Sequence, residues 1–229
     1  MLDYEHARAN MVDVQIAGRG LRNASVLDAM RAIPREKFVG EGFEDRAYED
    51  SPLPIGHGQT ISQPFIVAYM IEAARLEPGS RVLEVGTGSG YAAAVMAKVA
   101  REVFTIERHA ILGEAARRTL AALGFNDVVL RVGDGSNGWP DNAPFDAIIV
   151  AAASPTAPAS LKTQLVIGGR LIIPIGEDQQ SQRLVRVTRR SSESFEEEDL
   201  GGVSFVPLIG DQGWDEKLGR PSGQLQSRS

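Results

Sequence analysis

Three glycines and two acids in the middle of the chain have the spacing of a site for a nucleotide-type cofactor. The segment Glu84-Val85-Gly86-Thr87-Gly88-Ser89-Gly90 follows an apolar run and precedes a helical pattern. Glycines there let the backbone approach a ligand closely, and the start of a helix offers free N–H groups. Glu107 ends the next apolar run, 21 residues after Gly86. A carboxylate in that place can accept hydrogen bonds from both hydroxyls of a ribose.

The spacing of these glycines separates two kinds of cofactor. A dinucleotide site reads its pyrophosphate with G-x-G-x-x-G, whereas here the spacing is G-x-G-x-G with an acid two residues before the first glycine. The carboxylate of Glu84 would repel a pyrophosphate, but it suits the cationic groups of S-adenosylmethionine. The sequence therefore favours an S-adenosylmethionine-dependent methyltransferase, with S-adenosylhomocysteine as product, over an NAD-type dehydrogenase. A module that binds S-adenosylmethionine without turnover is a third interpretation.

A further acid follows the third apolar run. Gly133-Asp134-Gly135 would lie at the same edge of the sheet as the first two loops, because ligands of open parallel sheets bind beyond the carboxyl ends of the strands. We expect Asp134 to accept a hydrogen bond from the exocyclic amine of adenine. The alternative is a turn residue whose carboxylate bonds its own backbone between two glycines. We expect Gly135, and Arg108 next to Glu107, to contact the cofactor as well.

The composition excludes several other kinds of site. The 229 residues contain no cysteine, which rules out disulfides, thiolate metal sites, iron–sulfur clusters and a cysteine nucleophile. The three histidines (His6, His57 and His109) are widely spaced, so we expect no metal site. A net charge of −6 has the wrong sign for a nucleic-acid partner. No apolar run predicts a membrane span or a signal peptide, and we expect a cytoplasmic monomer.

Short apolar runs alternate with helical patterns through the middle of the chain, which is typical of a parallel sheet covered on both faces. The expected strands are rich in β-branched residues: 81–85, 102–106, 127–131, 145–150 and 170–175. Helical segments are predicted at 5–18, 25–33, 65–76, 91–100, 110–123 and 158–165. We expect Ser25 to cap the second of these helices. The segment 51–64, with three prolines and two glycines, predicts a rigid loop.

After Gly176 the alternation stops, and the runs 183–187 and 203–208 are separated by the acidic stretch 189–202. That composition predicts a solvated hairpin tip between two antiparallel strands. The expected fold is α/β: a doubly wound, mostly parallel seven-stranded sheet with a C-terminal antiparallel hairpin, of the Rossmann-like class I methyltransferase type, preceded by N-terminal helices. We expect one domain, 1–214, with helices and substrate loop in 1–80 and the cofactor-binding sheet in 81–210. A flexible tail, 215–229, would follow.

Several segments together resemble one methyltransferase family. GHGQTISQP (56–64), VLEVGTGSGY (82–91), GDGSNGW (133–139), PFDAIIVAAA (144–153) and GGRLIIPIG (168–176) are similar, in this order, to protein-L-isoaspartate O-methyltransferases. The resemblance covers residues 8–210, and GQTISQP is its most specific part. It implies methylation of the free carboxylate of L-isoaspartyl residues in damaged proteins and peptides, which starts repair through a succinimide. A carboxylate is already ionised at neutral pH, so this reaction needs no general base.

The resemblance also implies roles for individual residues. Ser62 stands in the position of the family's active-site serine, which contacts the substrate carboxylate. The alternative is that Ser62 caps the helix that begins near Gln63. Thr60 and Ile61 would belong to the same wall of the substrate site. Gln63 would bond peptide groups of the substrate, and the alternative is that it only braces the loop. Val206-Pro207-Leu208 would present backbone to an extended substrate segment, and the alternative there is an ordinary final strand.

One alternative lies within the same chemistry. Close relatives of the family methylate an aspartate in a dedicated precursor peptide, and the sequence leaves that substrate open. The segment after residue 210 is short for an added recognition domain, which favours the repair reaction.

Overall fold

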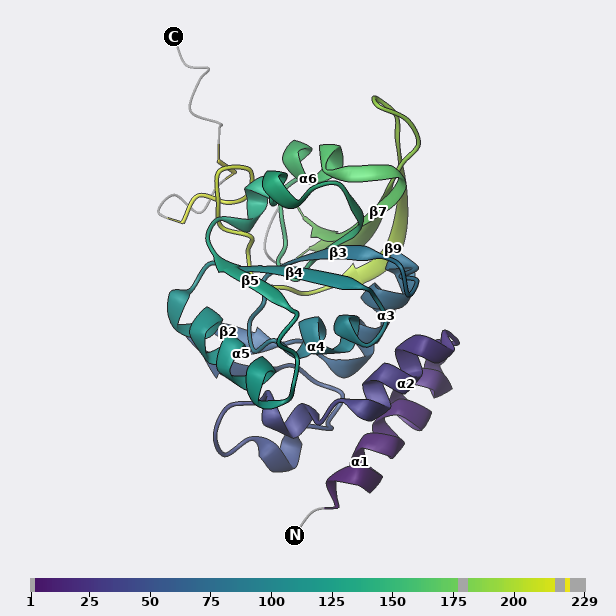
Figure 1. Ribbon diagram of the computed structural model, residues 1–229, viewed down its shortest axis with the longest axis vertical. Coiled ribbons are helices and arrows are strands. Elements are labelled where there is room, and N and C mark those ends of the chain that lie inside the picture. The colour runs from purple at the N-terminus through teal and green to yellow at the C-terminus, as the bar shows by residue number, and fades with distance from the viewer. Residues whose placement is uncertain (1–2, 177–180, 217–220, 223–229) are drawn as a thin grey trace.

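The fold is built on a seven-stranded sheet, seen in a computed structural model that describes residues 3–176, 181–216 and 221–222 (Figure 1). The order of its strands is β5-β4-β3-β6-β7-β8-β9. The strands are β3 (Arg81–Val85), β4 (Glu102–Glu107), β5 (Val129–Val132), β6 (Phe145–Val150), β7 (Leu165–Ile175), β8 (Gln182–Arg189) and β9 (Phe195–Val203). Pairing is parallel from β5 to β7 and antiparallel from β7 to β9. The predicted sheet is confirmed.

Helices cover both faces of this sheet. They are α1 (Tyr4–Asn10), α2 (Ala24–Ala32), α3 (Pro64–Ala74), α4 (Tyr91–Ala97), α5 (Ala110–Ala122) and α6 (Ala159–Thr163). Helices α3, α4 and α5 contact the strands from one side, and α2 packs on α3 and α4 as an outer layer, while α6 lies on the opposite side (Figure 1). The segment predicted as one long N-terminal helix is α1 followed by a π-helical turn, 11–16, and a short 3-10 turn.

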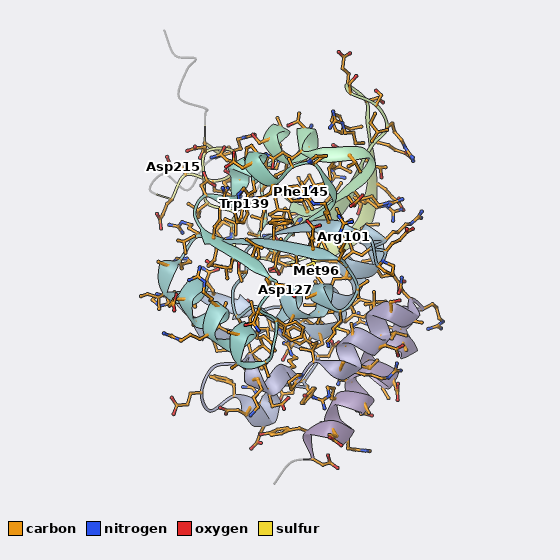
Figure 2. All side chains as sticks on the ribbon, in the orientation of Figure 1. Met96, Arg101, Asp127, Trp139, Phe145 and Asp215 are labelled. Carbon is orange, nitrogen blue, oxygen red and sulfur yellow. The ribbon has the colours of Figure 1, made fainter. Side chains whose placement is uncertain are left out.

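Alternate residues of the central strands enter two separate cores. Val82 belongs to the core beneath α3 and α4, and its neighbour Leu83 belongs to the core on the other face. Met96 and Phe145 mark these two cores on either side of the strands (Figure 2). Burial on both faces explains why the strands read as continuous apolar runs. Because side chains alternate along a strand, Glu84 faces the same side as Val82 and is buried there.

The last strand lies elsewhere than predicted. Residues 195–203, interpreted as part of a hairpin tip, form β9, and only residues 190–194 form the turn. The carboxylates of β9 pair with arginines across the strand, as in the ion pair between Arg186 and Glu198. An edge strand tolerates charge on its exposed side, so an acidic composition misled the prediction. Of the predicted strand 203–208, only Val203 belongs to the sheet, as the end of β9, and Pro207 makes an isolated bridge to Ala153.

The segment 51–64, predicted as an irregular rigid loop, contains a short hairpin. Its strands, β1 (Leu53–Gly56) and β2 (Gln59–Ile61), pair antiparallel. Gly56, His57 and Gly58 make the turn, with φ of 90°, 52° and 69°. Glycine adopts positive φ at little cost, which explains the two glycines around His57. The hairpin fixes the direction in which the chain enters α3.

Asn23, not Ser25, caps α2. The side-chain oxygen of Asn23 accepts a hydrogen bond from the backbone N–H of Val26 at 3.1 Å. Ser25 lies inside the first turn and is exposed.

Replacement of Asn23 with alanine should therefore lower the free energy of unfolding by about 1 kcal/mol, the usual cost of losing a helix cap. The matched variant Ser25→Ala should change it by less than about 0.5 kcal/mol. Urea denaturation of both variants measures the difference. Equal losses would contradict Asn23 as the cap.

Candidate active site

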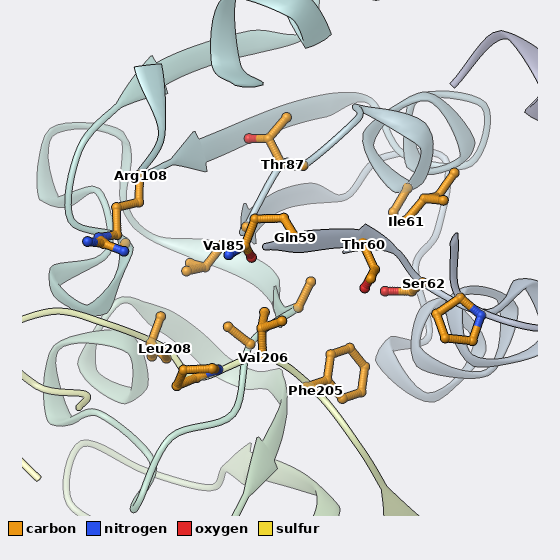
Figure 3. Close-up of a pocket in the computed structure, with 18 of the residues that line it drawn as sticks. Gln59, Thr60, Ile61, Ser62, Val85, Thr87, Arg108, Phe205, Val206 and Leu208 are labelled. Carbon is orange, nitrogen blue, oxygen red and sulfur yellow. The ribbon is translucent and has the colours of Figure 1, made fainter. Parts of the chain in front are cut away.

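One large cavity opens at the carboxyl ends of the parallel strands. Its volume is about 1330 Å³, above the roughly 300–1,000 Å³ typical of a site for one small ligand. The loops after β3 and β4 form one wall, and β2 with residues 203–208 forms another (Figure 3). The cavity therefore has room for a cofactor and for part of a second substrate.

The glycine-rich loop after β3 is a tight turn tied to β4. Gly86, Gly88 and Gly90 have φ of 95°, 54° and 89°, values that residues other than glycine rarely adopt. The amide of Gly86 donates to the carbonyl of Ile106 at 2.9 Å, and that of Gly88 donates to Oε2 of Glu107 at 2.8 Å. The expectation of free amides thus holds for only part of the loop. Of the residues predicted in this loop to contact the cofactor, Glu84, Gly86, Thr87, Gly88 and Ser89 line the cavity. Gly90 does not line it, and a Cβ there would instead lie 3.3 Å from the side chain of Leu120.

Glu84 is a buried carboxyl at the base of the cavity, 1% exposed. Its Oε2 accepts a hydrogen bond from the Thr105 hydroxyl at 2.5 Å, and that hydroxyl lies 2.6 Å from the hydroxyl of Thr87. Burial, helped by the charge of Glu107, raises the pKa of Glu84 to about 8. A nearby cation would offset this cost of ionisation, so the site fits the positively charged part of S-adenosylmethionine.

Glu107 ends β4 beside the glycine loop and is 4% exposed. Its two oxygens each accept one backbone hydrogen bond, from Gly88 and from His109, both at 2.8 Å. A carboxylate oxygen can accept a second bond, so both oxygens retain capacity for a ribose diol. Arg108 also lines the cavity and forms an ion pair with Glu216 at 2.5 Å.

Asp134 is not part of the cavity wall, although its neighbour Gly135 is. One oxygen of Asp134 accepts bonds from the backbone and hydroxyl of Ser136, at 2.8 and 2.7 Å. The other accepts from the backbone of Asp211 at 2.8 Å and the side chain of Asn137 at 3.2 Å. Because both oxygens already accept hydrogen bonds from the protein, the geometry supports the interpretation of Asp134 as a turn residue and does not support a contact with adenine. A Cβ on Gly135 would lie 2.3 Å from a methyl group of Val85, so glycine is needed there.

The segment 209–216 locks the turn that follows Asp134. The side-chain amide of Asn137 donates to Asp211 at 3.1 Å, and its oxygen accepts from Gln212 at 3.2 Å. The backbone amide of Gly138 donates to the carbonyl of Gly135 at 3.0 Å.

The same segment then reaches the cavity. The indole N–H of Trp214 donates to the carbonyl of Ala153 at 3.0 Å, and Trp214, Asp215 and Glu216 line the cavity. Residues 221–222 also contact this segment. Residues 215–216 and 221–222 of the predicted flexible tail thus make contacts with the rest of the chain, and its remaining positions lie outside the described residues.

Ser62 lines the cavity directly after β2. Among the described residues its hydroxyl has no hydrogen-bond partner. The N-cap position of α3 is occupied by Gln63, whose side chain makes no capping hydrogen bond. Ser62 therefore does not cap the helix. Thr60 shares its side of the extended segment, since side chains alternate, and both face the 205–206 wall (Figure 3). The side chain of Ile61 points into the core and is 4% exposed. Ile61 therefore contributes mainly its backbone to the cavity wall.

Residues 206–208 line the cavity, but much of their backbone is engaged. The carbonyl of Val206 accepts from the amide of Ala153 at 2.8 Å, and the amide of Leu208 donates to the carbonyl of Ala153 at 2.7 Å. The Pro207 carbonyl has no hydrogen-bond partner among the described residues. Among the described residues the backbone N–H of Val206 likewise has no partner, so the groups of this segment that could bind substrate backbone are the Pro207 carbonyl and the Val206 N–H.

Some residues that line the cavity were not predicted from the sequence. The rings of His57 and His109 stack with centroids 5.9 Å apart, joining the β1–β2 turn to the start of α5. Tyr91, directly after the glycine loop, and Trp214 also line the cavity. Only Tyr91 had a usable signal, its position next to the last glycine.

The described part of the chain contains no cluster of three or more histidine, cysteine or acidic side chains suited to a metal ion. It also contains no helix with the length and apolar content needed to cross a membrane.

A parallel sheet with a glycine-rich turn after its central strand, a buried acid below that turn and a second acid on the next strand define an S-adenosylmethionine-dependent methyltransferase. A solved protein-L-isoaspartate O-methyltransferase superimposes with a TM-score of 0.82 at 29% identity, over 90% of this chain and 67% of that one. A putative one from Plasmodium falciparum, in complex with S-adenosyl-L-homocysteine, gives 0.77 at 28% identity over 88% and 98%.

The family is defined by sequence as well. The family model described as Protein-L-isoaspartate(D-aspartate) O-methyltransferase matches residues 6–213. Protein-L-isoaspartate O-methyltransferase 1 of Rhodopseudomonas palustris (strain HaA2) is 61% identical over 90% of this chain and 84% of its own. The protein-L-isoaspartate O-methyltransferase of Brucella anthropi is 55% identical over 93% and 98%. The chain belongs to the protein-L-isoaspartate O-methyltransferase family.

The buried Glu84 gives stability a specific pH dependence. Its pKa rises from 4.5 to about 8 on folding, so between these values the folded protein holds a proton that the unfolded chain has released. The free energy of unfolding should fall as the pH rises through this window, by up to about 1.4 kcal/mol per pH unit from this group.

Urea denaturation at several pH values within that window, for wild type and Glu84→Gln, measures this contribution. The variant should lose it, and the exposed control Glu114→Gln should keep it. The same slope in all three proteins would contradict a protonated Glu84.

Proposed function

We propose that this chain transfers a methyl group from S-adenosylmethionine to the free carboxylate of L-isoaspartyl residues in damaged proteins and peptides, which starts their repair through a succinimide. The observation that carries the proposal is one cavity in which the cofactor loops of a methyltransferase meet the free hydroxyl of Ser62, in a member of this family. The two sides of the cavity have separate tasks.

The glycine-loop side would hold the cofactor. S-adenosylmethionine supplies a methyl group activated by its sulfonium. Glu107 would accept hydrogen bonds from the ribose hydroxyls, for which each of its oxygens has capacity. Glu84 would face the cationic part of the cofactor and become ionised there. Thr87, Ser89 and Gly135 complete the wall, and Arg108 with Glu216 lies beside it.

The Ser62 side would hold the acceptor. The acceptor arrives as an anion, so the residues here need to orient it rather than remove a proton. The Ser62 hydroxyl is a free donor for one carboxylate oxygen. It is followed by the start of α3, which has no side-chain cap and therefore presents the positive end of a helix. Thr60 and Gln63 would flank the carboxylate, and the Pro207 carbonyl would accept from substrate backbone.

The proposal places the reaction in the cytoplasm and gives the protein no nucleic-acid or membrane partner. The net charge of −6 supports the exclusion of a nucleic-acid partner, because a negatively charged protein is repelled by a phosphate backbone. A monomer suffices, because one chain supplies both walls of the cavity.

Transfer of labelled methyl from S-adenosylmethionine to two peptides tests the function. The peptides are identical except that one has an isoaspartyl and the other an aspartyl linkage at one position. Labelling should be confined largely to the isoaspartyl peptide. Equal labelling of both would overturn the repair assignment, and preference for the aspartyl peptide would favour a dedicated precursor as substrate.

Ser62→Ala should reduce kcat/KM for the isoaspartyl peptide about 10- to 150-fold, because a hydrogen bond to a charged group contributes about 1.5–3 kcal/mol. Its affinity for S-adenosylhomocysteine, measured by calorimetry, should stay within about twofold of wild type, since Ser62 lies on the acceptor side. Ser25→Ala, remote from the cavity, is the matched control. An unchanged kcat/KM, or an equal loss of cofactor affinity, would contradict this role.

A further inference from the structure

Arg35, in the short turn after α2, is a fully buried guanidinium without an acidic partner. The residue is 0% exposed and forms no ion pair with a carboxylate among the described residues; the charge of Asp50 still acts on it, although Asp50 is itself paired with Arg19. Its Nε donates to the carbonyl of Ala47 at 2.7 Å, and its Nη2 donates to the carbonyl of Ser62 at 2.9 Å. The remaining nitrogen, Nη1, is buried and has no hydrogen-bond partner.

The guanidinium also lies over an aromatic ring of the cavity wall. Its central carbon is 4.8 Å from the ring centroid of Tyr91, the first residue of α4. Tyr91 and Ser62 both line the cavity, whereas Arg35 does not. Arg35 therefore lies behind the wall and connects its acceptor side to the end of the glycine loop.

Such an arrangement is costly for stability alone. Taking a charge out of water costs several kcal/mol, and two carbonyls and a ring face compensate only part of it. Burial accordingly lowers the pKa of Arg35, although an arginine keeps its proton in proteins. An apolar side chain of similar length would fill the space without this cost, so packing gives no reason for a cation here.

The charges around the cavity supply a reason. The charged residues that line it are Glu84, Glu107, Arg108, Asp215 and Glu216, and the one cation among them is paired with Glu216. All of them come from the glycine-loop side or the C-terminal segment. The acceptor side has no charged lining residue, yet its ligand is an anion and the whole protein carries a charge of −6. Arg35 is a cation in direct contact with that side, because its side chain donates a hydrogen bond to the backbone carbonyl of Ser62.

We propose that Arg35 is a positioning residue for methyl transfer: it holds the Ser62 backbone in place and provides the fixed positive charge that favours an anionic acceptor at Ser62. This inference rests on the proposed function, because it assumes that the substrate carboxylate binds at Ser62. A buried charge is screened by solvent much less than an exposed one, so it acts on the cavity through the low-dielectric wall.

The test compares the affinity of two peptides that differ in charge at one group: an isoaspartyl peptide and the same peptide with the neutral isoasparaginyl residue. Wild type should bind the isoaspartyl peptide more tightly, and Arg35→Met should reduce that preference about tenfold or more. Arg35→Lys, which keeps the charge but not both hydrogen bonds, should retain most of the preference and lose kcat. Arg46→Met, at an exposed arginine, is the matched control and should behave as wild type.

Each outcome separates the two levels of the proposal. If wild type shows no preference for the isoaspartyl peptide and does not methylate it, the proposed function itself fails. If wild type shows both but Arg35→Met keeps the preference, the charge of Arg35 is not used and the inference is overturned. If Arg35→Met does not fold, the folded variant Arg35→Lys decides. Equal affinity of this variant for the isoaspartyl and isoasparaginyl peptides overturns the inference, and a retained preference for the isoaspartyl peptide supports it.

Discussion

The place of β3 in the sheet determines where a site can form. The chain runs from β3 outward through β4 to β5 and then returns to the other side of β3 as β6. The loops that leave β3 and β6 therefore diverge, and a crevice opens between them at the carboxyl ends of the strands. Close contacts keep this crevice narrow at its base: a Cβ on Gly86 would already touch Ala151 at 3.4 Å. The β1–β2 hairpin and the C-terminal segment close the remaining sides, so every part of the cavity depends on this crossover.

The cavity joins two ligands of opposite charge, and the protein meets each with a buried group of the other sign. Glu84 lies under the cofactor loops, and Arg35 lies behind Ser62. Both are withdrawn from water, where a charge is expensive but acts strongly over a short distance. An exposed pair would be screened by salt and would also attract unrelated ions. The acidic surface of the molecule is thus compatible with an anionic substrate, because the field that matters is local.

The parts of this fold that follow from local patterns were predictable. The strands 81–85 and 145–150 have the observed bounds, and the glycine loop and Glu107 lie where the spacing placed them. Features that depend on distant partners were not. The acids of β9 form a strand because arginines of β8 face them, and a composition cannot show that pairing.

The same limit applies to the residues of the site. Asp134 has the position expected of an adenine ligand, but the backbone N–H of Asp211, 77 positions away in the chain, donates to one of its oxygens. Arg35 follows a helix as many surface arginines do, and nothing adjacent to it indicates that its side chain will be buried against Ser62. Burial of a charged side chain is decided by tertiary packing, which hydrophobic periodicity does not report.

The locked turn around Asn137 affects how this protein ages. An Asn-Gly dipeptide deamidates when the glycine nitrogen attacks the side-chain amide, releases ammonia and forms a succinimide, the same ring that the repair reaction passes through. In Asn137-Gly138 that nitrogen is committed to the carbonyl of Gly135, and the amide is held by Asp134, Asp211 and Gln212. The folded chain thereby shields its own most susceptible bond. Opening of the C-terminal segment would remove the hydrogen bonds that Asn137 shares with Asp211 and Gln212.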